Sequence, residues 1–325
     1  YVHFNDFNVN PKIEDIRRGI EIFRRNNCDT VIAVGGGSVM DFAKAVNILS
    51  AHPEDPEKYV TKESSLSSFG MPLIAIPTTA GTGSEATHFA VVYIDKKKFS
   101  LTHEHMLPDD VILDASLTEN LPSYITATTG MDAFCQAMES YWCVNSTDES
   151  QGYASEAIGL LLDYLEIAVN KPTPFSRKAV MQAANLAGKA INISKTTACH
   201  AVSYPITSHF GVPHGHAVTL TLGKMFVYNS HVSDQDCLDS RGVNYVCKVM
   251  EDLCKMLGVD SSDKAEKKIH DLMDRIGLKK SLGELGINNK GLEIILNEGF
   301  NPERVKNNPR RLTRDKLRKM LQEIR

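Results

Sequence analysis

The hydrophobic pattern of the chain changes near Leu121, and this change constrains the fold more than any other feature. Before it, short apolar runs such as 31–34 and 73–76 alternate with patterns of helical period. Continuous apolar strands joined through helices are typical of a parallel sheet that is covered on both faces. After Leu121, long helical patterns follow one another without a strong strand signal. We therefore predict an α/β domain, residues 1–121, followed by an all-helical domain, residues 122–325.

The remaining elements follow from the same reading. Further strands are expected at 89–94, 99–101 and 111–113. Helices are expected at 13–23, from the glycines after the first strand to near Ser50, and at 123–143, 148–169, 174–194, 215–228, 234–256, 263–276 and 312–324. A cleft between two such domains is a natural place for a ligand.

Composition excludes several classes of function. The 325 residues carry a net charge of −4, with 42% hydrophobic and 23% charged residues, which is typical of a soluble globular protein. Basic residues are scattered except at 310–325, where apolar residues at helical spacing indicate a surface helix rather than a nucleic-acid site. No apolar run approaches the ~18–20 residues of a membrane helix, and the N-terminus lacks a signal-peptide pattern. The seven cysteines form no CxxC pair, so we interpret them as reduced thiols of a cytoplasmic protein.

Two turns suggest a nucleotide site. A glycine turn at 35–38 follows the strand at 31–34 and opens a helix that carries Asp41 and Lys44. Glycines allow the backbone to approach a phosphate, and the helix N-terminus supplies free N–H groups. The spacing is not G-x-G-x-x-G, so a tight structural turn is the alternative. A second turn at 77–85 follows the next strand and carries four hydroxyls and two glycines. Because ligands of open α/β sheets bind beyond the strand C-termini, the two turns together favour a dinucleotide site.

Residues suited to metal chemistry occur in the predicted helical domain. Asp132 and Gln136 are four residues apart on one helix and share a face. His200 and His214 follow downstream, with His209 between them. One carboxylate and several histidines can build a divalent-metal site, and such a metal polarises an alcohol or carbonyl oxygen. A solvated aspartate with ordinary core or surface histidines is the alternative, because no short metal motif demands this spacing.

Four segments resemble the iron-containing alcohol dehydrogenase family, and they occur in the same order as in that family. They are GGGSVMDFAK (35–44), PTTAGTGSEAT (77–87), GMDAFCQAMES (130–140) and PHGHAV (213–218). The likeness extends from about residue 10 to the C-terminus. It implies the dehydroquinate synthase-like fold of that family, a nucleotide-binding α/β domain followed by an all-helical metal-binding domain. The family usually begins with a further segment that holds the first strand and the residue selecting NAD over NADP. We expect this chain to lack that segment, so NAD(H) and NADP(H) both fit.

The resemblance also implies roles for individual residues. Toward the cofactor it implies Gly36, Gly37, Ser38, Asp41, Thr78, Thr79 and Thr82. As ligands of Fe(II) or Zn(II) it implies Asp132, Gln136, His200 and His214. The second ligand departs from the family pattern, which has a histidine where this chain has Gln136. An amide oxygen is a weaker ligand than imidazole for these metals, so we expect weaker binding, altered selectivity or a vacant site.

The proton relay departs from the family as well. Four residues after His200 the family often has a histidine, and this chain has Tyr204. A tyrosine hydroxyl can pass a proton, and His209 is the alternative catalytic group. The subgroup that the chain most resembles, phosphonoacetaldehyde reductases, is indicated by Gln136, Tyr204 and the segments 139–150, 187–218 and 305–313.

These observations lead to a functional expectation. We expect a cytoplasmic homodimer that uses NAD(P)H and a divalent metal to reduce a small aldehyde, and that binds neither nucleic acid nor membrane. The subgroup implies phosphonoacetaldehyde, reduced to 2-hydroxyethylphosphonate. An anionic substrate needs cationic or N–H donors, and the candidates are Lys195, Thr196, Thr197, His209 and the turn at 145–147. The alternatives are a dehydrogenase of short-chain alcohols, a lyase-type relative such as dehydroquinate synthase or glycerol-phosphate dehydrogenase, and a binding protein that has lost the metal.

Overall fold

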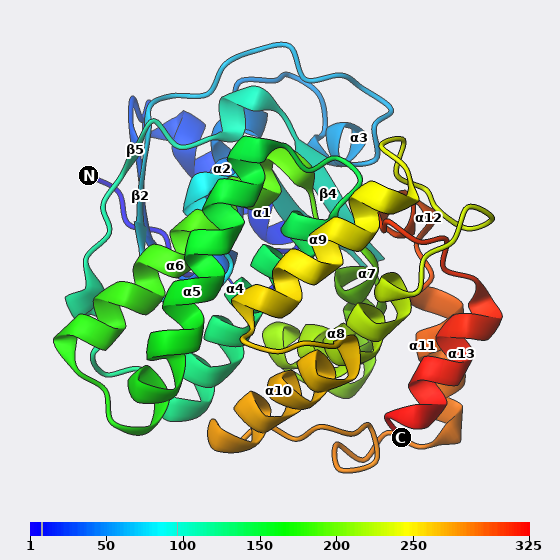
Figure 1. Ribbon diagram of the computed structural model, residues 1–325. Helices are drawn as coiled ribbons and strands as arrows, with labels where there is room; N and C mark the ends of the chain where they lie inside the picture. The colour runs from blue at the N-terminus through cyan, green and yellow to red at the C-terminus, as the bar shows by residue number, and fades with distance from the viewer. Residues whose placement is uncertain (8, 96) are drawn as a thin grey trace.

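The computed structural model describes residues 1–7, 9–95 and 97–325, with the backbone alone at residue 303. The first third of the chain, blue to cyan in Figure 1, lies at the top and back of the view, and the later helices fill the front and bottom. This arrangement confirms the predicted fold of an α/β domain followed by a helical domain. Among the described residues, no helix is long and apolar enough to cross a membrane.

The α/β domain is built on a small parallel sheet. Its strands are β1 (Val31–Gly35), β2 (Leu73–Pro77) and β5 (Asp110–Val111), in the order β1-β2-β5. The described residues of this part form three α-helices, which are α1 (Ile13–Arg25), α2 (Gly37–Ser50) and α3 (Pro56–Val60). Because β1 and β2 pair in parallel, with Val31 opposite Leu73, the glycine turn and the threonine turn leave the sheet at the same edge.

Two predicted strands do not join this sheet. β3 (Phe89–Ile94) and β4 (Lys97–Thr102) form a separate antiparallel hairpin. The prediction of one parallel sheet was therefore wrong for these segments. The reason is the short connection between them, because a parallel pair needs a crossover of about a dozen residues or more. The turn is entered through Asp95, whose φ of 54° lies in the left-handed region.

The sheet is also covered differently from the prediction. α2 packs on one face, where Ala33 and Ala75 are buried against Met40. On the other face Ile32 and Val34 are 61% and 53% exposed. The expectation of cover on both faces was therefore wrong for the described residues. α1 packs mainly against α2, with further contacts to α3 and to β3 of the hairpin.

From Ser123 onward the described residues form helices. They are α4 (Ser123–Trp142), α5 (Asp148–Asn170), α6 (Pro174–Ser194), α7 (Ala198–Phe210), α8 (His214–Ser230), α9 (Val243–Met256), α10 (Ser262–Arg275), α11 (Asn289–Glu298), α12 (Pro302–Val305) and α13 (Arg314–Glu323). α5 and α6 begin with capping boxes, in which Thr147 pairs with Ser150 and Thr173 with Ser176. The basic C-terminal stretch is a surface helix, as predicted, and α13 buries Leu317 beneath it.

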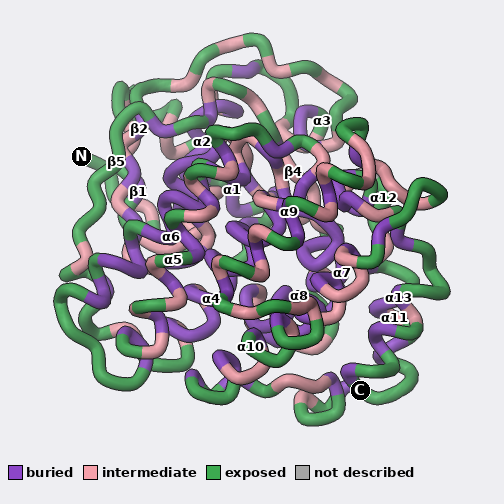
Figure 2. The backbone as a smooth tube through the Cα atoms, viewed as in Figure 1, coloured by how far each residue is buried: buried purple, intermediate pink, exposed green. Residues whose placement is uncertain are grey.

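α4 lies at the centre of the helical domain and is buried along almost its whole length (Figure 2). It contacts α5, α6 and α8, which explains why its apolar residues surround the helix rather than forming one stripe. The predicted helix at 234–256 begins only at Val243, because Gly242 has a φ of 89° and interrupts the helical path. α7, α11 and α12 were not predicted, and α7 contains Pro205, which weakens a helical pattern.

The two domains touch backbone to backbone beside the threonine turn. Gly83, with a φ of 59°, lies so close to Gly188 of α6 that a Cβ on Gly188 would sit 2.8 Å from the Cα of Gly83. Asn185 donates a hydrogen bond to Glu85 at 3.0 Å, and Asn192 accepts one from the backbone of His88 at 2.8 Å. These contacts hold the threonine turn against the helical domain and fix one wall of the cleft.

Candidate metal and cofactor site

A cavity of about 500 Å³ lies between the two domains. The α/β domain lines it with the glycine turn, the threonine turn and the β3–β4 hairpin, and the helical domain lines it with α4, α7 and the start of α8. The cavity therefore joins the turns that suggest a nucleotide site to the helices that carry the predicted metal ligands. This is the cleft that the domain organisation predicted.

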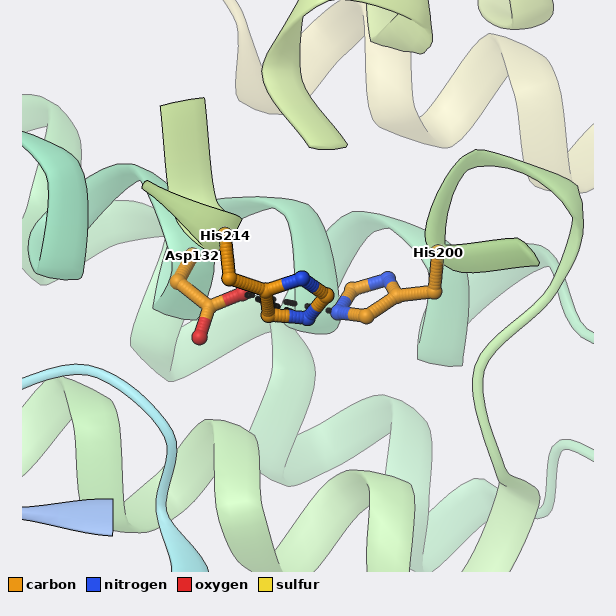
Figure 3. Close-up of side chains that lie close together, drawn as sticks. All are labelled: Asp132, His200 and His214. Atoms are coloured by element: carbon orange, nitrogen blue, oxygen red, sulfur yellow. Dashed lines mark ion pairs between the residues drawn. The ribbon is translucent and has the colours of Figure 1, made fainter. Parts of the chain in front are cut away.

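Three predicted ligands converge on one point of this cavity (Figure 3). Asp132 comes from α4, His200 from α7, and His214 is the first residue of α8. The Oδ1 atom of Asp132 lies 3.5 Å from Nε2 of His200 and 3.9 Å from Nε2 of His214. The ligand atoms of all three residues lie within 4.8 Å of one another. One carboxylate and two imidazoles at this spacing can bind a divalent transition metal.

Gln136, the predicted ligand that differs from the family pattern, lies one helical turn after Asp132 and lines the same cavity. Among the described residues, Oε1 of Gln136, Oδ1 of Asp132 and Nε2 of His200 are buried without a hydrogen-bond partner. Unpartnered buried polar atoms are costly, so three in one place need an explanation. A cation satisfies all three at once, and the residues present therefore fit a divalent metal.

Glu139 holds His200 in position for this centre. It lies seven residues after Asp132 on the same face of α4 and is fully buried. Its carboxylate accepts hydrogen bonds from the hydroxyl of Thr197 at 2.6 Å and the backbone N–H of Cys199 at 2.8 Å, and it pairs with Nδ1 of His200. The pairing leaves Nε2 of His200 facing the cavity, as the outer partner of a metal-binding histidine does. Sequence reasoning missed this role, although the spacing of seven from Asp132 is a signal for it.

The charges of the centre depend on one another. Burial lowers the pKa of His200, but Glu139 and Asp132 outweigh burial and raise it to about 9. Burial raises the pKa of the Asp132 carboxyl, yet His214 and His200 bring it below its ordinary value. Burial lowers the pKa of His214 to about 3. The proton of this ionic cluster is therefore held by His200, between Glu139 and Asp132. A cation bound here would take the place of that proton.

The two predicted relay groups lie in different places. Tyr204 lines the cavity and its ring stacks on His214, with 5.9 Å between ring centroids and 18° between planes. Burial raises the pKa of Tyr204, but Arg304 and Lys98 outweigh it and lower the pKa to about 8. His209 lies in the last turn of α7, exposed, with Nε2 2.8 Å from Glu298. It does not line the cavity, so the structure brings Tyr204 and not His209 to the centre.

The two predicted cofactor turns touch each other. A Cβ on Gly36 would lie 3.1 Å from Oγ1 of Thr79, and a Cβ on Gly37 would lie 2.6 Å from Cγ2 of Thr82. Glycine is therefore needed for the turns to meet at this distance. α2 begins at Gly37, so its first N–H groups face the cavity where these turns line it.

The other predicted cofactor residues differ in position. Ser38 lines the cavity, and its hydroxyl accepts a hydrogen bond from the backbone N–H of Asn10. Asp41 lines the wall, but its carboxylate accepts bonds from Ser84 and the backbone of Val91, which brace the threonine turn and the hairpin. Thr78 does not line the cavity, and its N–H donates to the carbonyl of Gly35.

Some of the predicted anion-binding residues line the cavity, and others are used in hydrogen bonds elsewhere. Thr196 lines the cavity, whereas the hydroxyl of Thr197 is committed to Glu139. In the turn at 145–147, the Ser146 carbonyl and hydroxyl accept bonds from Arg241. Sequence reasoning missed two cations that line the cavity, Lys98 on β4 and Arg304 on α12.

Comparison with known proteins places this geometry in a family. The family model described as iron-containing alcohol dehydrogenase matches residues 1–115, and that of the C-terminal part of the same family matches residues 126–324. The chain belongs to the iron-containing alcohol dehydrogenase family. It is therefore an oxidoreductase, and the family resemblance that was inferred from four sequence segments is confirmed.

Individual members of the iron-containing alcohol dehydrogenases show how close the relation is. The chain is 34% identical over 309 residues to the phosphonoacetaldehyde reductase of Streptomyces viridochromogenes, a match that covers 92% of this chain and 77% of that protein. It is 31% identical over 313 residues to the long-chain-alcohol dehydrogenase 1 of Geobacillus thermodenitrificans, covering 93% and 76%. Among solved structures, the sulfoacetaldehyde reductase of Bifidobacterium kashiwanohense in complex with NAD+ is similar with a TM-score of 0.88 and 33% identity, covering 99% and 82%.

Proposed function

We propose that this chain reduces a small aldehyde with an anionic headgroup, of the phosphonoacetaldehyde type, using a nicotinamide dinucleotide and a divalent metal. The observation that carries the metal assignment is the set of unpartnered buried atoms on Asp132, Gln136 and His200, with His214 beside them. The metal, when bound, supplies Lewis-acid polarisation of the carbonyl oxygen. The relatives named as phosphonoacetaldehyde and sulfoacetaldehyde reductases support the substrate class.

The cofactor assignment rests on the two turns. Gly36, Gly37 and Ser38 present backbone N–H groups and a hydroxyl at the start of α2, where a pyrophosphate binds favourably. Thr79 and Thr82 line the same wall and would contact the cofactor there. The dinucleotide, when bound, supplies the hydride.

The protein's own side chains have three further tasks. Asp132, His200, His214 and Gln136 hold the metal, and Glu139 keeps His200 oriented for it. Tyr204, stacked on His214, would give the proton of its hydroxyl to the former carbonyl oxygen after hydride transfer, which completes the alcohol.

One experiment tests the proposal. The protein is stripped with chelator, reloaded with Fe(II), Zn(II) or Mn(II), and mixed with NADH or NADPH and a panel of aldehydes, while the nicotinamide absorbance is followed. We expect metal-dependent turnover of small anionic aldehydes. Absence of turnover with every metal and aldehyde would refute the dehydrogenase assignment. Turnover that is unaffected by Asp132→Ala and His214→Ala would refute the metal assignment.

A second candidate function is oxidation of uncharged short-chain alcohols. The match to a long-chain-alcohol dehydrogenase favours an uncharged alcohol as the substrate, although one of longer chain, because that relative is also similar over most of its length. The same aldehyde panel separates the two, since this candidate predicts a preference for the neutral substrates. The homodimeric state and the cytoplasmic location expected from the sequence stay predictions.

A further inference from the structure

One end of the cavity carries positive charge from both domains. Lys98 enters from β4 of the α/β domain, and Arg304 enters from α12 of the helical domain. We propose that these two side chains, with the hydroxyl of Thr196, form the subsite that binds the substrate's headgroup, a tetrahedral oxyanion such as a phosphonate or a sulfonate. This inference rests on the proposed function and assigns the residues that would determine its substrate class.

The position of Lys98 follows from the register of the hairpin. Lys98 pairs with Tyr93 of β3, and the side chains of both line the cavity. Its Nζ lies 3.6 Å from the centroid of the Tyr204 ring, and the other neighbour of that ring is His214. The ammonium group and a metal ligand therefore contact the same aromatic ring. A substrate that extends from the predicted metal ligands to this ammonium group would lie next to the ring.

Arg304 completes the subsite from the opposite wall. Its guanidinium donates a hydrogen bond to Oγ1 of Thr196 at 3.2 Å, and Thr196 is buried while still lining the cavity. A guanidinium has five N–H donors in a planar fork, and this fork matches the oxygens of a phosphonate or sulfonate. The contact with Thr196 orients the fork at the cavity wall.

The backbone next to Thr196 is held in an uncommon conformation. Lys195 ends α6 with a φ of 74°, in the region that favours glycine. Such strain in a non-glycine residue persists where the surrounding structure enforces it, and it is found at ligand sites. Here the turn brings Thr196 to the cavity wall, and Nζ of Lys195 lies 3.0 Å from Nε2 of His88 just outside it.

Within the part of the chain that the structure describes, no carboxylate pairs with the cations at this end of the cavity. Among the ion pairs of the described residues, none involves Lys98, Lys195 or Arg304. The carboxylates whose charge acts on Lys98 are Asp41 and Asp132. Asp41 is committed to Ser84 and Val91, and Asp132 faces the two histidines. Neighbouring cations in a partly buried site repel one another, and a bound oxyanion removes that cost.

The glycine turn and the threonine turn offer another place for an anion, the cofactor phosphates. They are built from backbone N–H groups and hydroxyls at the start of α2. At the cationic end, Lys98 instead contacts the ring of Tyr204, which stacks on the predicted metal ligand His214. We therefore assign Lys98 and Arg304 to the substrate and not to the cofactor phosphates, and the experiment measures both.

The test compares substrates of one shape and different charge. Phosphonoacetaldehyde, sulfoacetaldehyde and 3,3-dimethylbutanal carry a dianionic, a monoanionic and a neutral tetrahedral group on the same two-carbon aldehyde. For each metal-loaded protein, the readout is the ratio of kcat/KM for an anionic aldehyde to that for the neutral one. We expect Lys98→Met and Arg304→Met each to lower this ratio about 10- to 100-fold through KM. Arg304→Lys should restore part of it.

The matched control is Lys97→Met. Lys97 is the preceding residue of β4 and is exposed on the other face of the strand. Its replacement therefore changes the net charge by the same amount as Lys98→Met without altering the cavity. It should leave the ratio as it is in the unmodified protein. Equal ratios for Lys98→Met, Arg304→Met and the unmodified protein would overturn the inference. So would a loss that appears in the NADH or NADPH dissociation constant instead of the substrate ratio.

A binding measurement keeps this result separate from the proposed function. Calorimetry with 2-hydroxyethylphosphonate does not require turnover. If the unmodified protein reduces no aldehyde but binds this ligand, and Lys98→Met and Arg304→Met weaken binding, the proposed function fails and the anion subsite stands. If aldehydes are reduced but 2-hydroxyethylphosphonate does not bind and the ratio shows no anionic preference, the subsite fails and the dehydrogenase stands.

Discussion

The carboxylate of Glu139 pairs with Nδ1 of His200 beneath the floor of the cavity, and this contact leaves Nε2 of the same ring facing Asp132. Because Glu139 is fully buried and also accepts bonds from Thr197 and Cys199, it is fixed before any ligand arrives. A metal-binding histidine held in this way loses little freedom on coordination.

Replacing Glu139 tests that relationship. We expect Glu139→Gln to weaken metal affinity about 10- to 100-fold, because the amide orients the ring less firmly and does not increase its basicity. Chelator competition on the purified protein measures the dissociation constant. The matched control is Glu149→Gln, at an exposed position in the first turn of α5, and it should leave the constant unchanged. Equal constants for Glu139→Gln and Glu149→Gln would contradict the prediction.

A substitution at Gln136 should strengthen metal binding rather than weaken it. Imidazole is a stronger ligand than an amide for Fe(II) and Zn(II), so Gln136→His should tighten binding at least about tenfold, or 1.4 kcal/mol. The same competition assay measures it, with the exposed Gln182→His as control for an added histidine. A weaker or unchanged affinity in Gln136→His would show that this position does not face the metal.

The cofactor turn has a steric requirement at Gly37. In Gly37→Ala the new Cβ would lie 2.6 Å from Cγ2 of Thr82, so the glycine turn and the threonine turn must separate. We expect NADH affinity to fall about tenfold or more, as measured by nicotinamide fluorescence. Gly152→Ala, where nothing lies within 4 Å of the new Cβ, should bind NADH normally. The idea fails if Gly37→Ala also does so.

The contact between domains predicts an effect on stability. Gly188→Ala places a Cβ 2.8 Å from the Cα of Gly83, and backbone atoms yield less easily than side chains. We expect the free energy of unfolding to fall by about 1–3 kcal/mol in denaturant titration. Gly159→Ala lies on the exposed side of α5 with nothing within 4 Å, and it should raise stability by about 0.5–1 kcal/mol. A result of the same sign for both substitutions would argue against a close domain contact.

The two relay candidates make different predictions. Tyr204→Phe keeps the ring against His214 but removes the hydroxyl, so kcat should fall about 100-fold or more if that hydroxyl gives the proton. His209→Ala should change kcat less than about twofold, since its ring faces Glu298 outside the cavity. Steady-state reduction of the best aldehyde measures both. A larger loss in His209→Ala than in Tyr204→Phe would reverse the assignment.

Much of the fold was predictable because it depends on local signals. The bounds of α6 agree with the prediction, and those of α4 and α5 agree to within a residue, since apolar periodicity and capping residues mark them. The hairpin of β3 and β4 was assigned to the wrong sheet, because an apolar stretch of sequence does not show which strand it pairs with. α7 was missed because its helical pattern is interrupted by Pro205.

Some residues of the candidate site could likewise be predicted from local sequence, and others could not. Asp132, His200 and His214 were found from sequence motifs, and they do converge. Lys98 was not found, because it lies in a run of three lysines and only the register of the hairpin shows which of them enters the cavity. Arg304 was missed for a related reason, as it lies 100 residues after Tyr204 in sequence and on a one-turn helix. Charges that meet only through tertiary structure leave no local pattern.

The close approach of Gly83 to Gly188 has a consequence for motion. No layer of side chains separates the two backbones there, so the domains cannot slide past each other at this point without a clash. We expect rotation about the contact to cost less than sliding. Lys98 and Arg304 belong to different domains, so an anion held by both would tie the two domains together across the cleft.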